Sequence, residues 1–224
     1  MSWAGNNCLM TSPVGGLMPP ITDGLVHWLP YTTNGSYRDG VTGTDIGSLV
    51  NDAYVGGDPI GLYGDGSGDY HLFNNWWAGL DAYSLVLRCR RSTTNKGVSL
   101  TGNASQQTGI VLTDTGHLFA GTNNYRIFKL SIGAGLDNVY GMSYDKNEDG
   151  DILNKIQMYL DGSQITGVTS QGTTPQTVPN VTAIIGAWIS QGLYFSGSIN
   201  HVLLYNRALT STEHATITSW IVNN

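Results

Sequence analysis

The sequence predicts an all-β protein, a two-sheet antiparallel jelly-roll sandwich with a short C-terminal helix. Three observations predict this class. From Ile21 onward, short runs of alternating apolar and polar residues are separated by turn residues. The composition favours Gly, Thr, Ser, Asn and Tyr, and only Glu148 and Glu213 of the sixteen acidic residues are glutamate. The pair Asp161-Gly162 is a strong hairpin signal, because both residues tolerate the positive φ of a type I′ turn.

The alternating runs predict a succession of strands. The expected strands are 24–31, 59–63, 70–73, 83–91, 97–101, 109–113, 117–120, 126–130, 138–144, 155–160, 164–168, 182–186 and 193–205. The polar, glycine-rich stretch between Tyr31 and Pro59 predicts a long surface loop.

One helix is expected, and its first turn carries a capping box. In Thr210-Ser211-Thr212-Glu213, the threonine hydroxyl accepts from the glutamate backbone N–H, and the glutamate side chain accepts from the threonine N–H. The helix is expected to run to about Val222. Glu213 therefore has a structural role that accounts for its presence.

The first twenty residues differ from the rest of the chain. Residues 1–20 are small, contain Gly and Pro, and show neither strand nor helix periodicity, so they predict an N-terminal arm or leader before a sandwich domain of residues 21–224. The apolar residues of the arm favour an anchor to a larger assembly, such as capsid or other virion proteins. The alternative is that the arm covers a sheet edge of its own domain.

Composition and charge exclude several kinds of partner. The net charge is −6 and no basic stripe is present, so no nucleic acid is expected as a partner. No apolar run approaches the length of a membrane span, and the start lacks a signal peptide, so the chain is expected to be made in the cytosol. Cys8 and Cys89 occur in unrelated contexts and predict thiols without a disulfide framework.

Three segments resemble the concanavalin A-like lectin and glucanase superfamily, and its laminin-G-like domains in particular. They are GLYGDGSGDYHL at 61–72, the hairpin segment from VYGMSYD to LDGSQI at 139–165, and AIIGAWISQGLYFSGSINHVLLYNRALTSTE at 183–213. The resemblance covers about residues 24–222 and implies the sandwich fold. Asn200-His201 stands where that family usually has an acidic pair, so His201 is interpreted as a histidine on a sheet face.

The same superfamily includes β-glucanases, which place two glutamates on one strand for acid/base and nucleophilic chemistry. Here Glu148 lies in a hairpin loop and Glu213 in a helix cap, and no strand-borne carboxylate pair or nucleophile elbow occurs. The sequence therefore predicts that the chain is not an enzyme.

The run from Asp145 to Asp151 predicts a calcium site. Asp145, Asn147, Asp149 and Asp151 alternate as oxygen donors, with Gly150 allowing a sharp turn, as in the first half of an EF-type loop. The bidentate glutamate that completes such a loop is absent, so the expected affinity is weak. A solvated hairpin tip is the alternative.

Loop aromatics predict glycan contacts, because the apolar faces of sugar rings stack on them. Trp76 and Trp77 follow Asn75 in an expected loop, and Tyr125 is a second loop aromatic. Trp28 lies in a strand-like run and is expected in the core.

Together these observations predict a non-enzymatic surface structural or adhesion module. The favoured setting is the virion surface, as a phage capsid decoration or fibre protein that binds glycans or cell-surface polysaccharide, and a homo-oligomer is expected. The alternatives are a free-standing carbohydrate-binding lectin and, with less support, a glycoside hydrolase.

Overall fold

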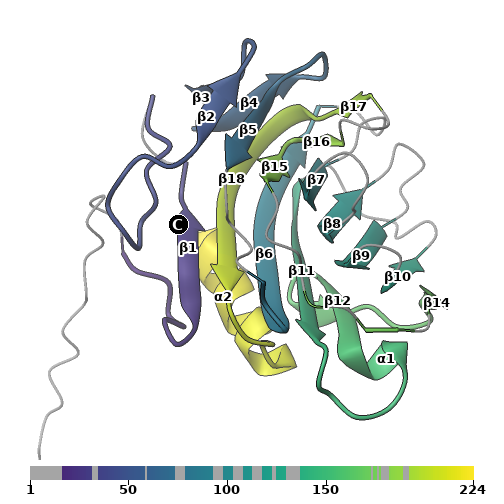
Figure 1. Ribbon diagram of the computed structural model, residues 1–224. Helices are drawn as coiled ribbons and strands as arrows, with labels where there is room; N and C mark the ends of the chain where they lie inside the picture. The colour runs from purple at the N-terminus through teal and green to yellow at the C-terminus, as the bar shows by residue number, and fades with distance from the viewer. Residues whose placement is uncertain are drawn as a thin grey trace, which may run out of the picture.

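Two antiparallel sheets lie face to face in the computed structural model of the protein (Figure 1). The structure describes residues 17–31, 35–58, 60–73, 79–92, 98–102, 108–112, 118–122, 125–129, 137–172, 174–175, 177, 182–188 and 192–224. Within these residues no helix is long and apolar enough to cross a membrane. The prediction of an all-β sandwich with a short C-terminal helix is confirmed.

The first sheet, called here the helix-bearing sheet, has the order β13-β12-β11-β6-β18-β4-β3, with β1 also paired to β18. Its two longest strands, β6 and β18, lie side by side near its centre and pair antiparallel. The strands are β1 (Leu25–Leu29), β3 (Tyr54–Gly56), β4 (Gly61–Asp65), β6 (Ala82–Arg91), β11 (Asp137–Asp145), β12 (Ile156–Leu160), β13 (Ser163–Gln164) and β18 (Ser196–Tyr205).

The second sheet has the order β14-β10-β9-β8-β7-β15-β5-β2, and β16 and β17 form a separate two-stranded pair. Its strands are β2 (Ser48–Val50), β5 (Tyr70–Phe73), β7 (Val98–Gly102), β8 (Thr108–Leu112), β9 (Leu118–Thr122), β10 (Tyr125–Lys129), β14 (Thr169–Gln171) and β15 (Ala183–Ile185), and the separate pair is β16 (Ala187–Trp188) and β17 (Leu193–Tyr194).

Strand alternation divides the apolar residues of the helix-bearing sheet between two clusters. On β6, Leu85, Leu87 and Cys89 point between the sheets into the main core, whereas Val86 points to the outer face. Ile199 of β18 also belongs to the main core. The outer face of this sheet is therefore free to carry other groups, and part of it is covered by the helix.

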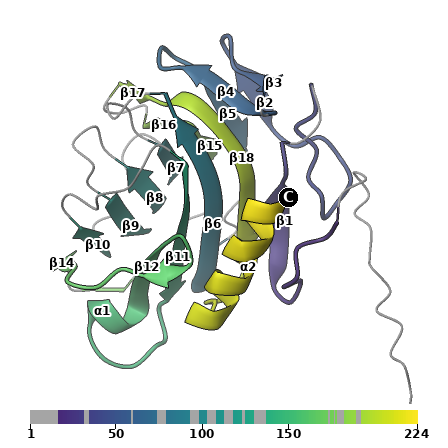
Figure 2. The same ribbon diagram turned by 180° about the vertical axis from the view of Figure 1, so that it is seen from behind.

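The C-terminal helix α2 (Ser211–Asn223) lies across the outer face of the helix-bearing sheet (Figure 2). It begins at the predicted capping box between Thr210 and Glu213, which is confirmed, and Arg207 adds a two-pronged ion pair to the Glu213 carboxylate. Apolar residues between the helix and the sheet form a second buried cluster. Its buried members are Trp28, Val86, Val139, Leu203, Tyr205, Leu209, Ile217 and Ile221.

The predicted hairpin turn at Asp161-Gly162 is confirmed, since both residues have positive φ, 49° and 79°. A second helical element, α1 (Ile152–Lys155), was not expected from the sequence. The Asp151 side chain caps it by accepting from the Leu153 backbone N–H, so this aspartate holds a helical turn in place of a strand extension.

The expected long loop between Tyr31 and Pro59 contains two short strands, β2 and β3. Each is three residues long, and they form because β5 and β4 offer partners, which local sequence does not encode. Most of the predicted arm, residues 1–16, lies outside the described residues. Of the remainder, Met18 packs against the apolar cluster under α2.

Candidate functional site

A pair of stacked tyrosines, one exposed and one half-buried, lies at one edge of the helix-bearing sheet. Tyr54 on β3 pairs with Tyr63 on β4, and the ring centroids lie 5.4 Å apart with planes 10° from parallel. Their neighbours Val55 and Leu62 point into the core, so the two rings lie on the outer face. Tyr54 is 52% exposed. Because the two rings cover each other and Tyr63 is half-buried, the pair is reached from solvent chiefly at the Tyr54 ring.

The adjacent turn is built to leave room for this stack. Gly57 has a φ of +85°, and a Cβ added there would lie 2.5 Å from the Tyr63 ring. Only glycine adopts this backbone conformation without strain and also avoids the ring. The close approach of backbone to ring fixes Tyr63 against the turn, and Tyr54 stacks on it from the edge strand.

A row of polar side chains continues from the tyrosines across the same face. The register pairs Tyr63 with Ser198, Ser198 with Arg90, and Arg90 with Asp137. Side chains directly opposite each other in an antiparallel pair lie about 5 Å apart. The outer face therefore changes, strand by strand, from an aromatic edge at β3 and β4 to charged groups at β6 and β11.

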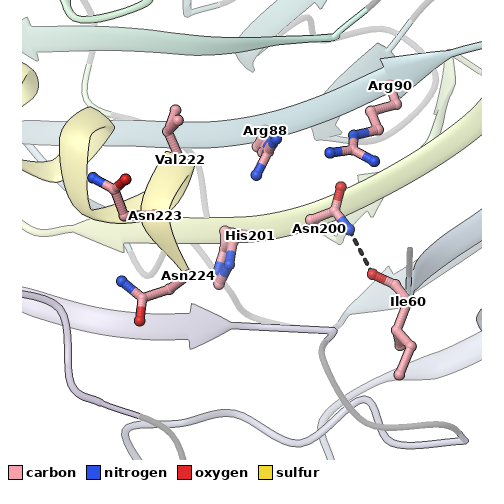
Figure 3. A pocket seen from close by; sticks show the side chains of 8 residues that line it. All are labelled: Ile60, Arg88, Arg90, Asn200, His201, Val222, Asn223 and Asn224. Carbon is pink, nitrogen blue, oxygen red and sulfur yellow. Dashed lines mark hydrogen bonds between the residues drawn. The ribbon is translucent and has the colours of Figure 1, made fainter. Parts of the chain in front are cut away.

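A cavity of about 430 Å³ opens on this face beside the polar row, and Arg90 belongs to both (Figure 3). The end of α2 forms one wall and the segment before β4 forms another. Its lining residues are Ile60, Arg88, Arg90, Asn200, His201, Val222, Asn223 and Asn224. The volume lies within the range of small-ligand pockets.

A bulge in β18 supplies the floor of the cavity. Ile199 pairs with Cys89 and Val202 with Leu87, so the register gains one residue on β18 between these pairs. Asn200 and His201 therefore share the space opposite one residue of β6, and both line the cavity. Bulges of this kind redirect side chains without ending the sheet.

Asn200 is 8% exposed and only half of its amide is satisfied. Its Nδ2 donates to the Ile60 carbonyl at 2.5 Å, whereas its Oδ1 has no hydrogen-bond partner in the described part of the chain. Figure 3 shows this oxygen pointing to the side where Arg88 and Arg90 lie. A buried acceptor without a donor costs free energy, so the position favours a ligand that donates.

His201 is 3% exposed and is held as a neutral ring. Burial lowers its pKa to about 4, and the positive charge of Arg88 acts in the same direction. Its Nδ1 lies 3.5 Å from the Trp28 indole Nε1, which can only donate, so the proton resides on Nε2. The expectation of a sheet-face histidine is confirmed, and its edge contact with Trp220 adds to its fixation.

Two arginines of the cavity share one carboxylate. Arg88 donates from Nε and Nη2 to the two oxygens of Asp137, each at 3.1 Å, and from Nη1 to the Ile221 carbonyl at 3.3 Å. Arg90 lies 2.6 Å from the same carboxylate through Nε. Two positively charged side chains therefore share one negatively charged side chain.

The loop aromatics predicted for glycan contact fall in two places. Asn75, Trp76 and Trp77 lie outside the described residues. Tyr125 is not a loop residue, because it opens β10 and is 3% exposed, in ring contact with Tyr144 in the core. Its ring is therefore not available for stacking on a sugar, and this expectation is corrected.

The predicted calcium residues lie between β11 and α1, and two of them have other partners. The Asp145 carboxylate accepts from the Asn147 N–H at 2.8 Å, and that of Asp151 caps α1. Lys155 directs its ammonium at the carbonyls of Lys146 and Glu148. Among the described residues no group of three or more His, Cys, Asp or Glu side chains is placed to hold a metal ion. Calcium binding, including by Asp149, stays a prediction.

Sequence reasoning singled out Asn200-His201 but missed the other residues that form the candidate site. Tyr54 lies in the stretch expected to be a loop, although Tyr54-Val55 already alternates in character. Arg88 and Arg90 fall in an expected strand, where two arginines on one face next to apolar residues on the other were the available signal. The bulge that directs Asn200 into the cavity has no sequence signal here.

Comparison with known proteins shows the fold. No protein-family model matches the chain, and no curated protein matches it. Trypanosoma rangeli sialidase matches 93% of this chain at 19% identity with a TM-score of 0.59, over 35% of the sialidase. The chain thus spans about a third of that enzyme's length.

Two further solved structures share the fold. Domain 4 of an extracellular GH43 arabinanase from Geobacillus stearothermophilus, solved in complex with arabinotriose, matches 87% of this chain and 98% of that domain at 15% identity, with a TM-score of 0.56. The receptor-binding domain of a botulinum neurotoxin C/D mosaic serotype matches 89% of this chain and 52% of that chain at 9% identity, with a TM-score of 0.60.

These matches correct two predictions. The expectation that the chain is not an enzyme is contradicted by the match to a sialidase, because the absence of the glucanase glutamate pair excludes only one catalytic pattern. The expectation of a non-enzymatic virion-surface module is contradicted as well, since two of the matched structures are a sialidase and a domain of an arabinanase. A composition rich in Gly, Thr and Asn reflects strands and turns, not the assembly that a sandwich belongs to.

Proposed function

We propose that the chain is a glycan-binding β-sandwich domain and that the sugar binds on the outer face of the helix-bearing sheet. The observation that carries the proposal is the stack of Tyr54 and Tyr63 beside the polar cavity around Asn200. Aromatic surface with a few fixed polar groups next to it is the composition that sugar rings require, because each ring has apolar C–H faces and a rim of hydroxyls.

The two parts of the site are close enough to serve one ligand. Tyr63 is paired with Ser198, which is two residues from Asn200 on β18. Two residues along a strand correspond to about 7 Å. A sugar residue in contact with the tyrosine rings would therefore lie near the cavity, and an oligosaccharide that crosses Tyr63 would reach from one into the other.

The comparisons support the glycan class of ligand. Domain 4 of the arabinanase was solved with arabinotriose, and the part of this chain that matches it corresponds to nearly the whole of that domain. The sialidase was also solved in complex with sialic acid. The class of ligand proposed for this chain is inferred from its own residues, because matches below 20% identity show a shared fold and not shared binding residues.

The test is a glycan array followed by titration calorimetry on the glycans that bind. Replacing Tyr54 with Ala removes the exposed ring and is expected to weaken binding about tenfold, since burial of one sugar face contributes about 1–2 kcal/mol. Leu153→Ala is the matched control, because Leu153 is 41% exposed but lies on α1 at the other end of the sheet.

The outcomes separate the possibilities. Loss of binding in the Tyr54 variant with retention in the Leu153 variant supports the proposal. No binding to any glycan, or equal binding by both variants, contradicts it. The same samples are assayed for released sugars, because the proteins that share the fold include an enzyme.

A further inference from the structure

We propose that the cavity on the outer face is a subsite for an acidic sugar residue. Arg88 and Arg90 would hold its carboxylate, and Asn200 Oδ1 would accept a hydrogen bond from a hydroxyl of the same residue. This inference rests on the proposed glycan-binding function and names the chemical class of its ligand.

The charge of the cavity favours an anion. Among the described residues that line it, only Arg88 and Arg90 have charged side chains, and Asp137 beside them supplies a single negative side-chain charge to both. His201 is a neutral donor through Nε2 and adds no charge. A partly closed cavity of this kind concentrates the positive potential and attracts an anionic group.

The two arginines have different roles. Arg88 is fixed, because three of its N–H groups already donate to Asp137 and to the Ile221 carbonyl. Arg90 contacts Asp137 through Nε in an ion pair at 2.6 Å without the geometry of a hydrogen bond, its side chain is 37% exposed, and within the residues that the structure describes none of its side-chain nitrogens makes a hydrogen bond. A free, planar guanidinium edge matches a carboxylate with two parallel hydrogen bonds.

The Asn200 side chain further restricts the chemical class of ligand that fits the cavity. Its Oδ1 is buried, unpartnered and directed to the arginine side of the cavity (Figure 3). An acceptor at this position repels a bare carboxylate oxygen and binds an O–H. A simple anion would satisfy the arginines and leave this oxygen unpaired, whereas a sugar acid carries a carboxylate and hydroxyls on one ring.

The probe is a disaccharide of glucuronic acid, compared with its methyl ester, which has the same ring and hydroxyls but no charge. Calorimetric titration of the intact protein is expected to show at least about tenfold tighter binding of the acid. The substitution Arg90→Gln is expected to remove this difference, and Arg90→Lys to retain part of it. Raising the salt concentration should weaken the acid selectively.

Arg126→Gln is the matched control, since Arg126 is a half-buried arginine of β10 in the second sheet and pairs with Gln171. Melting temperatures of all variants confirm that they fold. Equal affinity for acid and ester, or an unchanged acid affinity in Arg90→Gln, would overturn the inference.

The two proposals fail in different ways. If neutral oligosaccharides bind and the acid does not, the acidic subsite is wrong and the glycan-binding function stands. If the acid and all neutral oligosaccharides fail to bind, both are wrong.

Discussion

Ser143 on β11 and His214 on α2 lie 2.9 Å apart between Oγ and Nε2, in a contact that is buried from solvent. The Ser143 hydroxyl donates to the Leu209 carbonyl at 2.8 Å, and the hydroxyl oxygens of Ser143 and Ser84 lie 2.9 Å apart. The His214 ring also stacks on Tyr159, with centroids 3.8 Å apart. This polar contact fixes α2 on the sheet, and the end of α2 forms a wall of the cavity.

Replacing His214 with Ala is expected to lower the free energy of unfolding by about 2–4 kcal/mol, because it removes a buried ring and leaves the Ser143 hydroxyl with one partner fewer. Chemical denaturation measures the change. The control is Thr216→Ala, an exposed position on the same helix, for which a change within about 0.5 kcal/mol is expected. A His214 variant as stable as this control would show that the contact does not anchor the helix.

Stability is expected to decrease as the pH falls below about 6.5. Burial lowers the pKa of His71 and His214 to about 3 and that of His201 to about 4 in the folded protein. In the unfolded chain these rings protonate near pH 6.5, so the unfolded state binds protons first as the pH falls. Each ring contributes a loss of up to about 1.4 kcal/mol per pH unit until its folded-state pKa is reached.

Glu213 adds to the acid sensitivity at lower pH. The Arg207 guanidinium lowers the pKa of this carboxyl to about 2. The stability that the ionised Glu213 contributes is therefore fully present above about pH 4.5 and is lost as the pH falls through 2. Denaturation midpoints between pH 8 and 2 measure both contributions, that of the histidines below about pH 6.5 and that of Glu213 below about pH 4.5. A flat profile across this range would contradict the burial of neutral histidines.

Replacing Gly197 with Ala is expected to destabilise the protein by more than about 2 kcal/mol. Gly197 has a φ of +139°, and an added Cβ would lie 2.0 Å from the Arg90 carbonyl oxygen. The backbones of β18 and β6 would have to separate next to Arg90, so sugar binding should also weaken. Gly79→Ala is the control, because Gly79 also has positive φ but has no atom within 4 Å of the added Cβ. Equal stability of the two variants would exclude the close approach as the cause.

Calcium at about 1 mM is expected to raise the melting temperature, because the alternating oxygen donors of 145–151 predict a weak site, and the rise is expected to be lost in Asp149→Asn. The ammonium of Lys155 lies against the Lys146 and Glu148 carbonyls, which places a cation beside the loop. An unchanged melting temperature would show that the loop is only a solvated hairpin tip. Differential scanning fluorimetry with and without chelator distinguishes the two results.

Much of the fold could be predicted from the sequence because its signals are local. Alternation predicted β6, β11 and β18, and the turn chemistry of Asp161-Gly162 predicted the hairpin after β12. The capping box at Thr210 predicted the start of α2. The strands β2 and β3 could not be predicted, because three residues carry too little pattern and the strands form through pairing with distant partners.

The candidate site could not be predicted for a related reason. Tyr54 and Tyr63 meet only because β3 pairs with β4, and Arg88 faces Asn200 only because β18 carries a bulge. Neither event is visible in the local sequence. Tyr125 shows the opposite error, because an aromatic beside two asparagines was interpreted as a loop residue although it opens a buried strand.

The most direct test of the account is a glycan titration followed by backbone NMR, using a glycan that binds the purified protein. The account predicts that the amide shifts that change most cluster on the outer face, at Tyr54, Tyr63, 88–90 and 198–201. Shifts that cluster instead at Trp76 and Trp77, or at 145–151, with the outer face unchanged, would contradict it.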